Sequence, residues 1–403
     1  MKRQTRLRHS FFEFARRCRR GSRPLAVAAA AATLGAGATP HPEEDPVHTL
    51  KVAAVFNDTD IQLRLVYPTD SPSWYHQYWV YKGGEWARRG GAEEGPDPCG
   101  LYEDRISVMI DDGSVERFGV EGGYVTVHPG MRATATAADP GEVEEHPHLG
   151  GRLGRSDVRK FIPESRTGPS GPDSWRNVRP PGELERLRDE GVFLDLWQWR
   201  SHRSNPIGYA DNGYVLDYRH GAEGRSMYTT NQDADSGLPL KMYDPQRTGR
   251  AALRIEKLRR GEYGQDDPYF LREDDAIPFD PDGDWEEGDA LPHRLLREPS
   301  GSRGAIRADG EYRDGAWRVR LTRSLEAPDP RDSKSFVPGE TRQVAFAVHA
   351  ASGTRFHRVS NPLTLGLGVE ADLVAQKVEG DLDAAETEWT EIPVFYPGDP
   401  TAP

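Results

Sequence analysis

The chain has 403 residues, and its 52 Lys and Arg against 65 Asp and Glu give a formal net charge of −13. This acidic balance argues against a nucleic-acid partner, because binding to phosphate backbones needs a surplus of basic side chains. The 42 glycines and 32 prolines predict frequent turns, which suits a β-rich fold with long loops and excludes a simple helical bundle.

The N-terminal residues have the pattern of an export signal. Nine lysines and arginines with one acid precede an Ala-rich apolar run at 25–34, which is too short to span a bilayer. The sequence Ala36-Gly37-Ala38 then fits a small-x-small cleavage site. We therefore expect a signal peptide over residues 1–38, a linker over 39–46 and an exported, periplasmic protein with no membrane span. An uncleaved anchor is the alternative.

Cys99 would be the only cysteine left after cleavage, which excludes an internal disulfide.

The segment Val47–Tyr67 predicts a β-hairpin that opens the mature domain. Apolar residues alternate with polar ones on both sides of an Asn57-Asp58 turn. The next segment, Trp74–Trp86, is dense in aromatic side chains. We expect these to pack in the core, with a sugar-binding platform as the alternative.

The segment Tyr102–Met131 contains a predicted strand with two different faces. Apolar side chains at positions 106, 108 and 110 share one face, and Ser107, Met109 and Asp111 share the other. The strand is followed by the sequence Gly-Gly-Tyr-Val-Thr-Val-His, which ends at His128.

Two stretches, Ala133–Gly191 and Gly221–Asp289, are poor in apolar residues and predict long irregular insertions with one short helix each. His146 and His148 in the first stretch could hold a metal, but we interpret them as solvated. The acidic run Asp280–Glu287 in the second resembles a calcium loop without the spacing of an EF-hand.

The segment between the insertions contains a strand with two tryptophans. Trp197 and Trp199 lie two residues apart in Leu-Asp-Leu-Trp-Gln-Trp-Arg, so both indoles point to one face.

The last part of the chain predicts further strands separated by turns. They are expected at Ala305–Ala308, Ala316–Leu325, Gln343–His349, Asn361–Gly368 and Ile392–Tyr396. The run Val-Ala-Phe-Ala-Val in the third of them has no polar residue, which is typical of a strand at the centre of a sheet.

Short alternating strands without helical periodicity between them predict a single mostly-β domain over residues 47–397, with a tail over 398–403. We expect a two-sheet antiparallel β-sandwich with long loop insertions and a few short helices.

Several motifs of this chain resemble the ethylbenzene-dehydrogenase-related haem-binding domain. They are G-S-x-G-x-I-x-A-x-G from Gly301, D-G-x-W-x-V-x-x-x-R-x-L from Asp314, V-A-F-A-V from Val344, R-x-H-x-V-S from Arg355, and D-x-W-x-W-R with A-D-x-x-Y-V around the tryptophan strand. This family contains the haem b subunits of type II dimethyl-sulfoxide-reductase-like molybdenum enzymes and related cytochromes. The resemblance implies haem as the cofactor and a pocket walled in part by Trp197 and Trp199.

The resemblance also implies which residues bind the haem. Cytochrome-like members have two cysteines before the histidine, but Gly123 and Val127 stand at those positions here, which excludes covalent c-type attachment and leaves noncovalent b-type haem. Family haem b subunits use a methionine and a lysine on the iron. The strand from Asp314 to Arg323, however, contains arginines but no lysine. Arginine cannot ligate iron because it stays protonated.

We therefore expect His128 as one iron ligand and Met131 as the other, with Met109 as the alternative methionine. The opposing interpretation is that His128 makes an ordinary hydrogen bond.

The sequence contains no nucleophile elbow, zinc-protease motif, P-loop or dinucleotide-binding fingerprint. We therefore expect a noncatalytic electron-transfer protein, because haem supplies the redox chemistry and the protein supplies the pocket. Its partner would be a redox protein, such as a molybdenum-enzyme complex or a cytochrome. The alternative function is a haem-free β-sandwich module that binds carbohydrate or protein through the aromatic segment.

Overall fold

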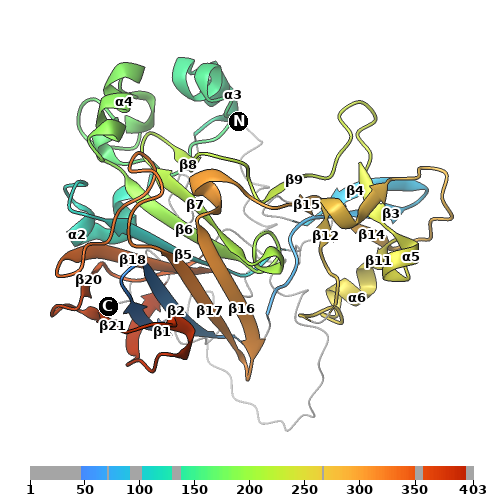
Figure 1. Cartoon of the computed structure of the whole chain (residues 1–403). Helices are drawn as coiled ribbons and strands as arrows, with labels where there is room; N and C mark the ends of the chain where they lie inside the picture. The colour runs from blue at the N-terminus through green and yellow to red at the C-terminus, as the bar shows by residue number, and fades with distance from the viewer. Residues whose placement is uncertain are drawn as a thin grey trace, which may run out of the picture.

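The computed structural model describes residues 47–69, 72–90, 102–128, 138–265, 267–349 and 357–395. The fold is mostly β, as predicted, but its main sheet is a closed barrel of ten strands (Figure 1). In order around the barrel these strands are β1 (Val47–Phe56), β2 (Asp60–Pro68), β17 (Ala316–Ser324), β16 (Ile306–Arg313), β7 (Tyr209–Val215), β6 (Leu194–Arg200), β5 (Arg105–Asp111), β18 (Thr341–His349), β20 (Leu363–Leu367) and β21 (Leu373–Lys377). The expected signal peptide, linker and tail lie outside the described residues.

The predicted two-sheet sandwich is wrong because the sheet has no separate halves. The C-terminal part of β1 pairs in parallel with β21, through Ala54 to Ala375, and this pairing closes the ring. The N-terminal part of β1 pairs with β22 (Thr390–Phe395), which is connected to β18 through β19 (Arg358–Val359). Strands of a sandwich and of a small barrel show the same alternation, so the pattern does not distinguish the two.

Smaller sheets lie beside the barrel (Figure 1). They contain β11 (Leu253–Arg254), β14 (Asp289–Pro292), β3 (Tyr78–Lys82) and β4 (Glu85–Arg89); β12 (Leu271–Arg272), β15 (Arg294–Leu296) and β9 (Tyr228–Thr230); and β10 (Lys241–Tyr243) with β13 (Ala276–Pro278). β8 (Arg219–Gly221) pairs with β7. The insertion Gly221–Asp289, expected to be irregular, therefore forms several short strands.

The helices are short, as expected. They are α2 (Phe118–Glu121), α3 (Pro140–Glu145), α4 (Pro181–Asp189), α5 (Pro245–Thr248) and α6 (Ile255–Arg259), with single turns η1 (Gly122–Thr126), η2 (Pro147–Arg152), η3 (Pro163–Ser165), η4 (Ser174–Arg176), η5 (Asn205–Ile207), η6 (Glu273–Asp275), η7 (Gly301–Gly304) and η8 (Leu382–Ala384). Within the described ranges, none of them has the length and apolar character needed to cross a membrane.

Aromatic side chains fill the inside of the barrel. Trp197, Trp199 and Trp317 are each at most 1 % exposed, and the rings of Trp199 and Trp317 have centroids 4.8 Å apart. Gly310 on β16 leaves room for the Trp199 indole, because a Cβ there would lie 2.5 Å from its Cζ2 atom. Asn205 fixes this contact. Its Oδ1 accepts hydrogen bonds from the Trp199 indole (2.9 Å) and from the backbone N–H of Gly310 (2.8 Å).

The barrel interior also contains a fully buried ion pair. Arg323 on β17 donates to Asp195 on β6 over 2.6 Å, and both side chains are 0 % exposed. The guanidinium also donates to the backbone carbonyl of Lys334 and lies 4.7 Å from the centre of the Trp197 ring. Arg323 is thereby held by groups from two other segments of the chain, strand β6 and the segment around Lys334.

We predict that Asp195→Asn lowers the free energy of unfolding by about 3–5 kcal/mol, because it leaves the Arg323 charge buried without a counter-ion. Denaturant unfolding followed by tryptophan fluorescence measures this change. The control is Glu185→Gln, which breaks a half-exposed pair with Arg331 and should change the stability by less than about 1 kcal/mol. Equal effects of the two substitutions would contradict the prediction.

Candidate functional site

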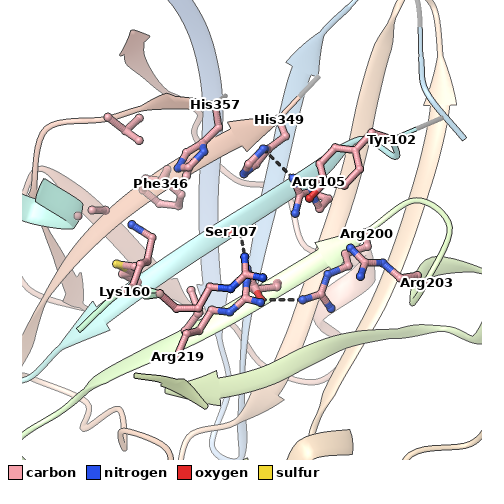
Figure 2. A pocket seen from close by; sticks show the side chains of 18 of the residues that line it. Tyr102, Arg105, Ser107, Lys160, Arg200, Arg203, Arg219, Phe346, His349 and His357 are labelled. Carbon is pink, nitrogen blue, oxygen red and sulfur yellow. Dashed lines mark hydrogen bonds between the residues drawn. The ribbon is translucent and has the colours of Figure 1, made fainter. Parts of the chain in front are cut away.

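A cavity of about 310 Å³ lies against the outer wall of the barrel, on β5, β6 and β18 (Figure 2). Its volume is at the lower end of the range of small-molecule sites, roughly 300–1,000 Å³. Successive side chains of a strand point to opposite faces, so every second side chain of these strands points out of the barrel. These outward side chains form the floor of the cavity. Hydrogen-bonded register then aligns these side chains in three rows across the strands: Ala345, Met109 and Leu196; Ala347, Ser107 and Gln198; His349, Arg105 and Arg200.

The three rows differ in chemistry from one end of the cavity to the other. The first is apolar, the second is small or uncharged, and the third carries two guanidinium groups and an imidazole. Met109 and Arg105 are four residues apart on one strand, which corresponds to about 13 Å. The floor therefore changes from apolar to cationic over that length.

The apolar end also contains an amine and a thioether beside the turn η1. Met109 is 6 % exposed, and its sulfur would lie 3.9 Å from a Cβ added at Gly123, which lines the cavity. Lys160 lines the same cavity, and its Nζ donates to Thr126 Oγ1 over 3.0 Å. Both side chains are thus placed at the same short segment, Gly122–Thr126.

The cationic end is built from several segments of the chain. Among the residues that the structure describes, six arginines and one lysine line the cavity, and none of these described lining residues is Asp or Glu. Figure 2 shows Arg105, Arg200 and Arg219 around the cavity, each reaching it from a different strand. Carboxylates behind the wall hold two of the arginines: Asp211 pairs with Arg200 over 2.7 Å, and Glu103 pairs with Arg203.

The arginines influence one another electrostatically. Burial, with the nearby charges of Arg200 and Arg159, lowers the pKa of Arg219 to about 10. Burial likewise lowers the pKa of Arg105 and of Arg294. A lowered arginine pKa means that the surroundings do not fully offset the cost of holding the positive charge there. A bound anion would therefore stabilise this end of the cavity.

Two histidines, His349 and His357, border the cavity with rings 4.0 Å apart. Arg105 Nη2 lies 2.9 Å from His349 Nδ1. Because a guanidinium can only donate, His349 accepts this bond at Nδ1 and carries its proton on Nε2.

The structure brings one of the predicted haem ligands into this cavity. Met109 is among its lining residues, whereas His128 is not; His128 is 7 % exposed and stacks on Phe161, with ring centroids 5.5 Å apart. Met131 lies outside the described residues. Trp197 and Trp199 point to one face, as predicted, but that face is the barrel interior and not the cavity wall.

Sequence reasoning missed Lys160 and the arginines. Lys160, Arg219 and Arg294 come from segments far apart in the chain, and no motif surrounds them. A partial signal was present in β5, where Arg105 and Ser107 share the outward face with Met109.

The other predicted sites have structural roles. Trp74, Tyr75 and Trp79 are buried, which confirms core packing for the aromatic segment. His148 was expected to be solvated, but it is buried and its Nε2 lies 2.5 Å from Asp217 Oδ2. Across the described part of the chain, no group of three His, Cys, Asp or Glu could hold a metal ion.

A family sequence model described as ethylbenzene dehydrogenase matches residues 24–360, which include every segment that lines the cavity. This confirms the resemblance inferred from the motifs. No curated protein matches the sequence.

A buried histidine behind the cavity predicts acid sensitivity. His202 accepts a hydrogen bond at Nδ1 from the backbone N–H of His76, which lines the cavity (2.8 Å). Burial lowers the pKa of His202 from 6.5 to about 4. Between these values the unfolded chain binds a proton that the folded chain does not, so stability falls as the pH is lowered through this window, by about 3 kcal/mol at its acid end.

We expect His202→Asn, whose Oδ1 can accept the same N–H, to remove this part of the pH dependence. Urea unfolding at pH 7, 5.5 and 4 measures it in both proteins. A pH dependence that is identical in the variant and the wild type would contradict the prediction.

Proposed function

The chain belongs to the ethylbenzene dehydrogenase family, and from this premise we propose that it is an exported, noncatalytic protein that binds haem b and transfers electrons. It would resemble the haem b subunits of type II dimethyl-sulfoxide-reductase-like molybdenum enzymes. The observation that carries this proposal is the presence of Met109 and Lys160 in one cavity beside the same turn. A methionine and a lysine are the two iron ligands that the family resemblance implies.

The residues present in the cavity fit a haem. The apolar row of Ala345, Met109 and Leu196 suits a macrocycle, and a methionine thioether is a competent iron ligand. Lys160 would be the second ligand, in place of the His128 expected from the sequence. When bound, haem supplies the one-electron chemistry, and the protein supplies orientation, the ligands and exclusion of water.

The attachment would be noncovalent. Gly123 lines the cavity at the position where cytochrome-like members have a cysteine, and Val127 stands at the second such position. Since neither side chain has a thiol, no thioether bond to haem can form at this site.

The basic N-terminal segment and the apolar run that follows it support export. An electron-transfer role would require a redox partner protein. The alternative of a carbohydrate-binding module has less support, because the aromatic segment that would form its platform is largely buried.

The proposal predicts a Soret band in protein purified from haem-supplied cells. Met109→Leu keeps the apolar volume but removes the thioether, so we expect the low-spin spectrum to be lost or converted to high spin. Lys160→Gln should have a similar spectral effect. Ultraviolet–visible and magnetic circular dichroism spectra of the ferric and ferrous forms measure both.

His128→Ala is the matched control, because His128 is buried nearby but does not line the cavity. We expect its low-spin spectrum to be unchanged. Loss of that spectrum in His128→Ala, with Met109→Leu unaffected, would instead support the ligand set expected from the sequence. Wild-type protein without a Soret band, even after titration with haem, would overturn the proposed function.

A further inference from the structure

Three arginines at the cationic end of the cavity have no carboxylate partner among the residues that the structure describes. Arg105 donates to the His349 ring, and Arg294 donates to Thr230 and Gln77, which are neutral oxygen acceptors. Arg219 makes no ion pair within the described ranges. The Nε atoms of Arg105 and Arg294 are buried and have no hydrogen-bond acceptor among the described residues.

This arrangement differs from that of the other arginines nearby. Arg200 and Arg203 are each neutralised by a buried carboxylate, Asp211 and Glu103 respectively. If the wall served only to stabilise the fold, we would expect the buried Arg105 and the partly buried Arg219 and Arg294 to be paired in the same way, because removing an uncompensated charge from water is destabilising. The unpaired charges all border the cavity instead.

We propose that Arg105, Arg219 and Arg294 form an anion subsite that binds the two carboxylates of the tetrapyrrole, with its iron toward Met109. This inference rests on the proposed function and adds the orientation of the ligand. Guanidinium groups suit the role, since they bind carboxylates through two parallel hydrogen bonds and keep their charge. The change from an apolar to a cationic floor over about 13 Å matches a ligand with an apolar body and an anionic edge.

The test compares two ligands and four proteins. The ligands are ferric protoporphyrin IX and its dimethyl ester, which has the same ring and iron but no carboxylate. The proteins are the wild type, Arg219→Gln, Arg294→Gln and the control Arg318→Gln, which changes a half-exposed arginine on β17 away from the cavity. Dissociation constants are measured by Soret titration, and circular dichroism verifies that each variant is folded.

We expect the wild type to bind the free acid about ten- to a hundredfold more tightly than the ester, the effect of one or two charge-assisted hydrogen bonds. Arg219→Gln and Arg294→Gln should each weaken binding of the free acid and leave binding of the ester nearly unchanged. Arg219→Lys, which keeps the charge, should recover part of the loss. Arg318→Gln should bind both ligands as the wild type does.

Equal affinity of the wild type for the acid and the ester would overturn the subsite and leave the proposed function standing. The same holds if Arg219→Gln and Arg294→Gln weaken both ligands equally, since the arginines would then act on the fold of the pocket. If the wild type binds neither ligand, the proposed function itself fails, and the subsite fails with it.

Discussion

The packing inside the barrel decides where this protein can bind a ligand. Trp199 fills the space above Gly310, and the buried pair of Asp195 and Arg323 joins two strands across the interior. Close packing of this kind leaves few voids larger than a water molecule in a protein interior. Because side chains alternate along a strand, the residues between the interior ones must point outward, and on β5, β6 and β18 they form the floor of the cavity.

The register of these three strands gives the cavity its direction. Met109 is aligned with apolar neighbours on both sides, and Arg105 is aligned with His349 and Arg200. A shift of one residue in either pairing would turn these side chains to the opposite face. The hydrogen bonds that join β5, β6 and β18 in the barrel wall therefore also separate the apolar from the cationic end, and the chemistry of the site depends directly on the fold.

Several features of the site were predictable from local sequence, and others were not. Alternation alone places Met109 and Ser107 on one face of a strand, and the family motifs identify the ethylbenzene dehydrogenase family. The assignment of the tryptophans to a pocket wall did not follow from alternation, because a period of two shows that Trp197 and Trp199 share a face but not which face is the interior. Lys160 had no local signal, since its proximity to Thr126 depends on how the first insertion folds back onto the barrel.

The sequence by itself determined the class of the protein: its β content, most strands of its barrel and its family membership, because these depend on residue type and short-range periodicity. Only the tertiary structure decided that the sheet closes, since closure requires Ala54 to pair with Ala375, more than 300 residues away. It also decided that Arg105, Arg219 and Arg294 share one cavity. These arginines come from distant segments of the chain, and their proximity depends on how the whole chain folds, so no local sequence pattern predicts it.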